Sequence, residues 1–579
     1  SSAASDVYKR QIGVIPGPQP TPEYLKPEYL KTLTESEYEV NFNSARTGIR
    51  LNGPIPQWVR EDGGEAGLHP SNIHDNAYAV GTLDLTGDQS ILLGPDGPSL
   101  GGFVCSVTTA KGEMWKLGQL HPGDKVHFRL LDLDQAKEIR EAEEANLRHE
   151  YKEVVLPEQK DLDYHYAILA EETAAGTKIV ARLDGEDNIL VEYGEMELDI
   201  AIRFRVHVLM QELKKKDLPV IDLTPGIRSL QIHFDIGKIS LKEMLAAVLE
   251  TNRTLPELSD VTVPSRIIWL PLSWDDPQTQ LAAKRYQQTV RPNAPWCPSN
   301  PEFIRRINGL DSIEDVKKIV FDADYLVLGL GDVYLGAPVA TPVDPRHRMV
   351  TTKYNPARPW TPENAVGIGG AYLCVYGMEG PGGYQFVGRT IQMWNPLKET
   401  EYFKHGKPWL LDFFDQIRFY PVSAEEILKD REDFLRGRFK IKIEETSFNL
   451  GKYQEFLKEH EDTIRVFKDH QEASFEAERK MWKEKGLDEF DSETQDAPAI
   501  VEETVPDGCE AARTNIPGSV WKVLVEDGQK VREGDTLVIL ESMKMEFPVT
   551  AEYSGTIEKV YLKPGEQVNS GQLAASIRV

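Results

Sequence analysis

Residues 513–579 read RTNIPGSVWKVLVEDGQKVREGDTLVILESMKMEFPVTAEYSGTIEKVYLKPGEQVNSGQLAASIRV and contain an internal repeat. Each half carries enough short apolar runs for about four strands. Two similar β-rich halves in so short a segment predict a pseudo-twofold β-sandwich. At an offset of 37 residues, Gly518, Lys522, Val523, Gly528, Val531 and Gly534 fall on Gly555, Lys559, Val560, Gly565, Val568 and Gly571.

The seam between the two halves is residues 541–546 (ESMKME), so the sandwich would present Lys544 at an exposed turn. A lysine between two methionines at this place resembles the attachment site of biotin carboxyl carrier domains, and the resemblance covers residues 513–579. It implies covalent biotin on Lys544. Met543 and Met545 would offer the ligase flexible apolar side chains to contact. Lipoyl domains share the fold but usually carry Asp-Lys-Ala, and the other alternative is an ordinary surface lysine.

The composition of the whole chain excludes several classes of partner. Its 579 residues are enough for several domains, at about 100 to 200 residues each. With 66 Lys and Arg against 93 Asp and Glu, the net charge of −27 disfavours nucleic acid and anionic membrane surfaces as partners. No window is long and apolar enough for a membrane helix, and no secretory signal is found. The four cysteines lie far apart, which is typical of a reducing compartment, so we expect a cytoplasmic protein.

Changes in composition divide the chain into a series of predicted segments. Residues 12–140 and 155–422 form two β-rich lobes, 423–490 a helical extension, 491–512 a linker and 513–579 the carrier. The linker is acidic, contains proline and lacks hydrophobic periodicity. The predicted fold class is therefore mainly β with α+β elements.

Apolar alternation between turn residues predicts short strands in both lobes. The Pro-rich residues 13–35 suit an extended segment, and the charged residues 134–153 an exposed connecting helix. Strands are expected at residues 77–85, 90–93, 125–130, 167–169, 179–183, 189–193 and 229–235, and an amphipathic helix at residues 241–250.

Two stretches upstream of the carrier also resemble known families. Residues 93–128, with GPDGPSLGGFVC and WKLGQLHPGDKVHF, are similar to the allophanate-hydrolase-subunit-2-like (Kip-type) family. Residues 224–235 (TPGIRSLQIHFD) and 325–390, with YLVLGLGDVYLG, DPRHRMV and GPGGYQFVGRT, are similar to the subunit-1-like partner family. Both families are fused, in this order and before a biotinyl domain, in the C-terminal part of urea carboxylase and urea amidolyase.

This resemblance implies a carboxyltransferase that moves the carboxyl group of carboxybiotin to urea and so forms allophanate. It implies as partners a biotin carboxylase domain of the same full-length protein, a biotin protein ligase, urea and allophanate hydrolase. No GxxxxGK[ST] loop or ATP-grasp-like region is found, so the ATP-dependent step lies elsewhere. Two alternatives stay open: a biotin-dependent or 5-oxoprolinase-like enzyme acting on another amide, and a Kip-type interaction or inhibitor module, which has no need of biotin.

The first residues depart from the family pattern. The run SSAASDVYKRQ lacks periodicity and an initial methionine, and the stretch resembling GLxTTVQDxGR that normally opens the subunit-2-like unit is not found. We therefore expect a fragment that begins inside the first lobe.

The transferase chemistry requires cations or N–H donors at a developing oxyanion, and polar groups that fix planar urea. The run 380–383 (GPGG) offers backbone N–H groups unobstructed by Cβ, so Gly382 and Gly383 are predicted to contact biotin. Alternatively, the run is a simple turn and the charged residues form structural ion pairs. The predicted catalytic residues are Arg346 and Arg348, as a fork for a carboxylate, together with Asp332, Tyr384, Gln385 and Arg389.

No metal site and no acyl-enzyme nucleophile is predicted. His69, His74 and Asp75 lie close together, but in loop-like sequence without helical spacing. No GxSxG or Ser-x-x-Lys arrangement appears in the chain.

Overall fold

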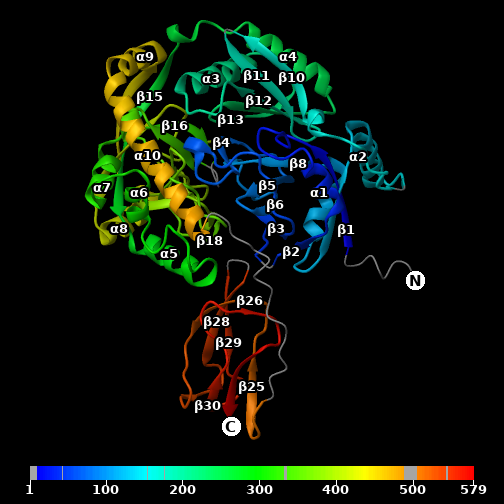
Figure 1. Cartoon of the computed structure of the whole chain (residues 1–579), viewed down its shortest axis with the longest axis vertical. Coiled ribbons are helices and arrows are strands. Elements are labelled where there is room, and N and C mark those ends of the chain that lie inside the picture. Colours follow the sequence, from blue (N-terminus) through cyan, green and yellow to red (C-terminus); the bar gives the residue numbers. More distant parts are fainter. Residues whose placement is uncertain are drawn as a thin grey trace.

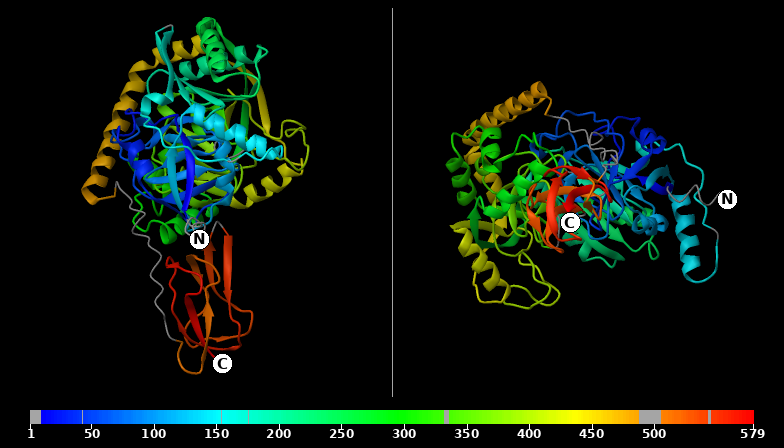
Figure 2. Two further views of the ribbon diagram at one scale, coloured as in Figure 1. Left: turned by 90° about the vertical axis from the view of Figure 1, so that its right-hand side faces the viewer. Right: turned by 90° about the horizontal axis from the view of Figure 1, so that it is seen from below.

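The computed structural model describes residues 9–41, 43–152, 154–174, 176–331, 336–487, 505–542 and 545–579. Two β-barrels lie side by side, with an α/β sheet above them and the carrier domain below (Figure 1). Figure 2 shows the same carrier projecting from the underside of the body in a view turned by 90°. Among the described residues, no helix combines the length and apolarity that a membrane span requires.

The first barrel closes because its first strand pairs with its last. β1 (Lys9–Pro16) runs parallel to β9 (Lys125–Leu130) and antiparallel to β8 (Cys105–Thr109). In β9, Val126, Phe128 and Leu130 are buried while the residues between them are partly exposed, which is the alternation of a half-buried strand. The remaining strands, in the order β8-β5-β6-β3-β2-β9, are β5 (Thr82–Thr86), β6 (Gln89–Leu93), β3 (Gly48–Asn52) and β2 (Tyr38–Val40).

The second barrel repeats this pattern. β15 (Thr262–Trp274) runs parallel to β23 (Gln416–Val422) and antiparallel to β22 (Gln385–Arg389), so the sheet closes on itself. Buried Ile268, Leu270 and Leu272 of β15 point into its core. The other strands of the ring are β16 (Tyr325–Leu330), β17 (Pro338–Pro342), β20 (Tyr372–Val375) and β19 (Ala365–Gly369).

The two barrels share one strand order, and two strands of the first, β5 and β6, match β19 and β20 of the second at a shift of 283 residues. β5 (Thr82–Thr86) maps on β19 (Ala365–Gly369), and the left-handed turn glycines Gly87 and Gly370 map on each other. Each barrel adds a two-stranded ribbon that faces the other barrel. The ribbons are β4 (Asn72–Ala77) with β7 (Leu100–Phe103), and β18 (Arg358–Thr361) with β21 (Gly380–Gly382).

A five-stranded sheet covers the upper side of the barrels, with α3 (Ile200–Lys214) and α4 (Leu241–Arg253) packed on it. Ser240 caps α4 in a reciprocal bond pattern with Glu243, which explains where the helix begins. The strands, in sheet order, are β10 (Ile168–Ala174), β11 (Thr177–Leu183), β12 (Asn188–Tyr193), β14 (Ser229–Phe234) and β13 (Val220–Pro225).

The remaining helices lie on the outside of the barrels. α1 (Tyr29–Glu35) and α2 (Leu133–Leu147) belong to the first barrel, and α2 stands out from the body in Figure 2. The others flank the second barrel (Figure 1): α5 (Pro277–Thr289), α6 (Asn300–Ile307), α7 (Ile313–Asp322), α8 (Ala424–Leu435), α9 (Leu450–Glu459) and α10 (Glu461–Lys485).

The carrier is a sandwich of two four-stranded sheets, as the internal repeat predicts. The offset of 37 residues carries β26 (Gly518–Val523) onto β30 (Gly555–Val560) and β27 (Lys530–Val531) onto β31 (Gln567–Val568). The other strands are β25 (Cys509–Arg513), β28 (Thr536–Ser542), β29 (Met545–Thr550) and β32 (Leu573–Arg578).

Several element predictions are confirmed, and others are wrong. Residues 13–35 are not simply extended, because they include the end of β1 and the helix α1. The expected strand 77–85 is broken at Gly81, whose φ of +84° turns the chain between β4 and β5. The extension 423–490 is not purely helical, because β24 (Lys442–Asn449) pairs with β15. Most of the predicted linker lies outside the described residues, and β25 begins within its last part.

Candidate functional site

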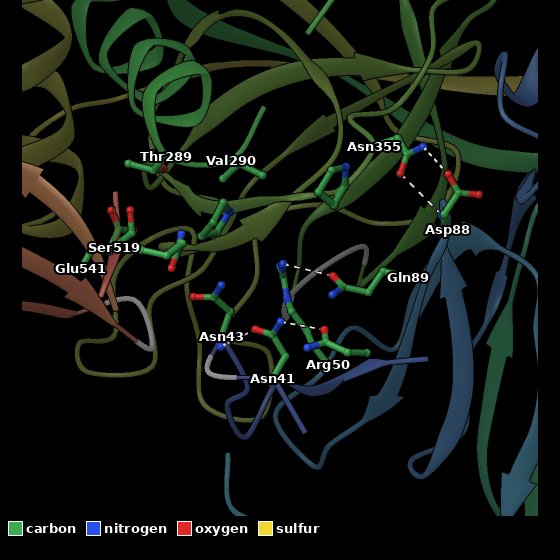
Figure 3. Close-up of a pocket in the computed structure, with 14 residues that line it drawn as sticks. Asn41, Asn43, Arg50, Asp88, Gln89, Thr289, Val290, Asn355, Ser519 and Glu541 are labelled. Atoms are coloured by element: carbon green, nitrogen blue, oxygen red, sulfur yellow. Dashed lines mark hydrogen bonds between the residues drawn. The ribbon is translucent and has the colours of Figure 1, made fainter. Parts of the chain in front are cut away.

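The carrier meets the two barrels at a cavity that we call the junction cavity (Figure 3). Ser519 and Glu541 of the carrier line one side of it, and Arg50 and Gln89 of the first barrel line another. Glu541 lies in β28 (Thr536–Ser542), which pairs with β29 (Met545–Thr550) to form the carrier hairpin. Met543 and Lys544 lie outside the described residues.

Arg285 of α5 connects the carrier to the second barrel. Its guanidinium lies between the rings of Trp360 and Trp521, at 5.1 and 4.3 Å from their centroids. It donates to Glu541 Oε2 at 2.7 Å and lies 3.4 Å from Glu546 Oε1. A cation held between two aromatic faces and beside two carboxylates fixes the orientation of the carrier.

A second cavity, the inter-barrel cavity, adjoins the first and shares Asn43 and Arg50 with it. Its volume is about 100 Å³. Gly101 and Gly102 of β7 and Gly382 of β21 form part of its wall, and Asp84, Thr86, Ile91 and Leu93 of the first barrel form another part. Its lining residues include Arg50, Tyr78, Asp84, Lys353, Gly382, Gly383 and Tyr384.

Lys353 forms a buried ion pair with Asp75 at the wall of this cavity. The Nζ–Oδ1 distance is 3.5 Å, and the side chains are 2% and 0% exposed. Lys353 Nζ also donates to Gly102 O at 2.8 Å, and the Tyr384 hydroxyl donates to Asp75 Oδ2 at 3.0 Å. Burial raises the pKa of Asp75, an effect that the charge of Lys353 opposes. A Cβ at position 102 would collide with both charged groups, which explains the glycine there.

Asp84 is a carboxyl group poised to exchange a proton near neutral pH. It is buried in β5, and this burial raises its pKa to about 7. The Thr86 hydroxyl donates to its Oδ2 at 2.9 Å, whereas Oδ1 has no hydrogen-bond partner among the described residues. A group with this pKa can accept or donate a proton in catalysis.

Arg50 lies where the two cavities meet. It is buried, and its Nη1 lies 3.3 Å from Gln89 Oε1, to which it donates. Burial lowers the pKa of Arg50 to about 10, so the guanidinium stays charged at neutral pH. A buried cation at this position is suited to attract a carboxylate entering from the carrier.

Only part of the predicted site is brought together at the cavities. Gly382, Gly383 and Tyr384 line the inter-barrel cavity. Gln385 lies behind it, fully buried, and donates to Thr352 O at 3.0 Å. Asp332 lies outside the described residues, as do Met543 and Lys544, and nothing is described of the Met545 side chain.

The three predicted arginines lie away from both cavities and make structural contacts. Arg346 forms a forked pair with Asp344, and Arg389 donates to the Glu363 carbonyl oxygen. Arg348 donates to Pro342 O and to the Tyr453 hydroxyl. These contacts fit the alternative prediction that the arginines form structural pairs. The cations that line the inter-barrel cavity are instead Arg50 and Lys353.

Sequence reasoning missed Arg50, Asp75, Asp84 and Lys353. A signal existed for Asp84, since a carboxylate between two leucines in TLDLT (residues 82–86) is unusual in a buried strand. Asp75 was considered only as a possible metal ligand, together with His69 and His74. Within the described parts of the chain, no group of three or more His, Cys, Asp or Glu could hold a metal ion.

Comparison with protein families identifies the units of this architecture. Residues 1–130 match the family described as "Carboxyltransferase domain, subdomain A and B", and residues 179–403 match "Carboxyltransferase domain, subdomain C and D". Residues 504–577 match "Biotin-requiring enzyme". A biotinylated protein of Mycobacterium leprae is 44% identical over 68 residues, which are 12% of this chain and 96% of that protein. The C-terminal unit is thus a biotin carrier, and covalent biotin is its cofactor.

Longer relatives resemble nearly the whole chain. The urea amidolyase of Lachancea kluyveri is 38% identical over 583 residues, which cover 99% of this chain and 32% of that protein. The crystal structure of Kluyveromyces lactis urea carboxylase superimposes with a TM-score of 0.89 at 37% identity, over 98% of this chain and 50% of that one. The chain therefore spans a third to a half of the length of these relatives.

Proposed function

Because the chain belongs to the biotin-dependent carboxyltransferase family found in urea amidolyases and urea carboxylases, we propose that it transfers a carboxyl group from biotin on Lys544 to urea. The product is allophanate. The observation that carries this proposal is the carrier hairpin at the junction cavity, next to an inter-barrel cavity that holds Arg50, Asp84 and Lys353.

The residues of the two cavities fit a carboxylated biotin ring. Gly101, Gly382 and Gly383 present backbone without Cβ atoms, and Leu93 and Phe103 supply apolar wall. When bound, biotin supplies the carboxyl group that is to be transferred. Lys544, with Met543 and Met545 beside it, is the proposed attachment point.

The buried cations stabilise negative charge. Arg50, which lines both cavities, binds the incoming carboxylate, and Lys353 stabilises the negative charge that develops in the inter-barrel cavity. Both act in a protein interior, where a fixed charge interacts more strongly than in water. Ser519 and Glu541 of the docked carrier line the junction cavity and would shield it from water.

Asp84 handles the proton of the acceptor. Transfer would break the bond between biotin N1′ and the carboxyl carbon and form a C–N bond on urea. Asp84 Oδ1, a buried oxygen, would receive the N–H proton that urea loses and would pass a proton on to N1′. The Tyr384 hydroxyl, which donates to Asp75, keeps the Lys353–Asp75 pair oriented.

The proposal is tested with the biotinylated chain, a separately supplied biotin carboxylase, ATP and labelled bicarbonate. Urea should give labelled allophanate, whereas Lys544→Arg should give none and should lose streptavidin reactivity. Product from another amide but none from urea would replace urea by that amide as the substrate. No product from any amide would remove the enzymatic proposal.

The partners follow from the reaction. The relatives are longer than this chain, and a biotin carboxylase domain of the same full-length protein would recharge the carrier. A biotin protein ligase attaches the cofactor, and allophanate hydrolase consumes the product. We place these steps in the cytoplasm.

A further inference from the structure

Tyr78 brings a hydroxyl group to the inter-barrel cavity. It follows β4 directly, its side chain is buried, and its ring belongs to a small apolar cluster with Ile91, Leu93 and Cys105. The hydroxyl oxygen accepts a hydrogen bond from the Phe103 N–H at 2.8 Å. Phe103 lines the inter-barrel cavity, as does Tyr78 itself, so the hydroxyl end of the ring lies at this cavity.

The proton of this hydroxyl has no acceptor within the part of the chain that the structure describes. Its oxygen already accepts a backbone N–H, so its own hydrogen is left for another acceptor. Two other hydroxyls that line the cavity differ in this respect. Tyr384 donates to Asp75 at 3.0 Å, and the Thr86 hydroxyl donates to Asp84 at 2.9 Å. The Tyr78 hydroxyl is therefore a donor that a ligand in the cavity can use.

The strand β7 holds this hydroxyl in place. A Cβ at position 101 would lie 2.7 Å from the Tyr78 oxygen, so Gly101 leaves room for it. In the next peptide unit, the Phe103 N–H donates to Tyr78, and Gly102 O accepts from Lys353 Nζ at 2.8 Å. The N–H and C=O groups of a trans peptide point in opposite directions. The Tyr78 hydroxyl and the Lys353 ammonium group therefore lie on opposite sides of this peptide and face different atoms of a ligand.

Burial keeps the Tyr78 phenol protonated. It raises the pKa of Tyr78 well above its ordinary value, and the charge of Asp84 raises this pKa further. The group thus stays a neutral hydrogen-bond donor at physiological pH. Asp84 lines the same cavity, and the proposed function assigns to it the proton of biotin N1′. In biotin, the ureido oxygen sits on the carbon that is bonded to N1′, so a donor near Asp84 is placed to reach that oxygen.

We propose that the Tyr78 hydroxyl is a catalytic group that donates a hydrogen bond to the ureido oxygen of biotin. The inference rests on the proposed function for the identity of this ligand. When the bond between N1′ and the carboxyl carbon breaks, its electron pair stays with the biotin ring, and part of the negative charge moves to the ureido oxygen. Tyr78 stabilises this charge without losing its proton, because the proton that N1′ gains comes from urea through Asp84.

The direct test measures binding to the full Lys544→Arg chain, which carries no biotin of its own. The ligands are biotin methyl ester and its thio analogue, in which sulfur, a weaker acceptor, replaces the ureido oxygen. Tyr78→Phe should weaken the binding of biotin methyl ester about tenfold and that of the thio ester less, so that the preference for oxygen is lost. Calorimetry gives the dissociation constants. Tyr29→Phe, which removes a hydroxyl bonded to Ser106 Oγ in the same barrel, is the matched control and should bind both esters normally.

Carboxyl transfer by the biotinylated chain gives a second readout. Tyr78→Phe should slow transfer about a hundredfold and leave KM for urea unchanged, because the hydroxyl contacts biotin and not urea. If Tyr78→Phe does not fold, Gly101→Ala should cause the same selective loss of binding, since its Cβ would displace the hydroxyl.

Two binding results would overturn the inference: equal weakening for both esters, or unchanged binding of biotin methyl ester. Equal weakening would show that the Tyr78 hydroxyl only shapes the cavity. The binding readout needs no urea, so it is separate from turnover. Selective loss of binding in a protein that does not carboxylate urea would retain the role of Tyr78 and refute the proposed acceptor. Transfer to urea at the wild-type rate by Tyr78→Phe would retain the proposed function and refute the role of Tyr78.

Discussion

Lys353 and Asp75 form an ion pair that is almost fully buried, so each partner depends on the other. Lys353→Met should abolish measurable transfer and lower the free energy of unfolding by about 3 to 5 kcal/mol, because a buried carboxylate is left unpaired. The double variant Lys353→Met/Asp75→Asn should recover most of this stability and none of the activity. Thermal denaturation and carboxyl transfer measure the two effects. Normal transfer by Lys353→Met would remove Lys353 from the mechanism.

Asp84 should make stability depend on pH. Its pKa is about 7 in the folded protein and near its ordinary value when unfolded, so the folded state prefers the protonated form. The contribution is complete below about pH 4 and is lost as the pH rises through about 7. Relative to Asp84→Asn, the wild type should lose up to about 4 kcal/mol over this range.

Denaturant unfolding at several pH values measures this difference. Asp96→Asn, which alters an exposed carboxylate paired with Arg46, is the control and should follow the wild type. Asp84→Asn should also lose the step near pH 7 in the transfer rate. Parallel stability curves for the wild type and Asp84→Asn would show that Asp84 does not titrate there.

α5 (Pro277–Thr289) carries the contact that orients the carrier. Arg285→Ala removes the cation between Trp360 and Trp521 and its bond to Glu541, so transfer should slow about tenfold or more. KM for urea should stay unchanged, because the contact lies outside the inter-barrel cavity. Lys284→Ala, exposed on the same helix, is the control. Wild-type rates in Arg285→Ala would show that this contact does not position the carrier.

Sequence patterns predict elements best where the signal is local. The repeat around residues 518–571 determines the sandwich, because identical turn glycines recur at one spacing. Barrel closure has no such signal, since β1 and β9 pair in parallel across more than a hundred residues. β24 (KIEETSFN) has only Ile443 and Phe448 as apolar residues, so its sequence lacks the alternation that predicts a strand.

The candidate site shows the same difference between local and long-range signals. The glycine-rich run 380–383, which includes β21, and Tyr384 were predicted because their motif is contiguous. Asp75 and Asp84 lie in β4 and β5 of the first barrel, whereas Lys353 comes from the second, and only the contact between the barrels brings Lys353 to them. Arginines in the conspicuous stretch 346–348 instead satisfy nearby oxygens.

At the scale of the whole molecule, the two barrels share one strand order but contribute different residues to the inter-barrel cavity. The shift of 283 residues places Gly367 and Gly369 where the first barrel has Asp84 and Thr86. Tyr384 packs against both glycines, so the equivalent space in the second barrel is filled by its ring. The duplication thus supplies two ribbons for one cavity.

The central claim is that biotin on the carrier delivers its carboxyl group beside Lys353. A single-turnover measurement tests it most directly: the chain is carboxylated with labelled bicarbonate, isolated, mixed with urea, and followed for loss of label from the protein. The wild type should transfer its label to urea within one turnover, and Lys353→Met should retain it while remaining biotinylated. Loss of label to urea at the same rate from both proteins would contradict the account.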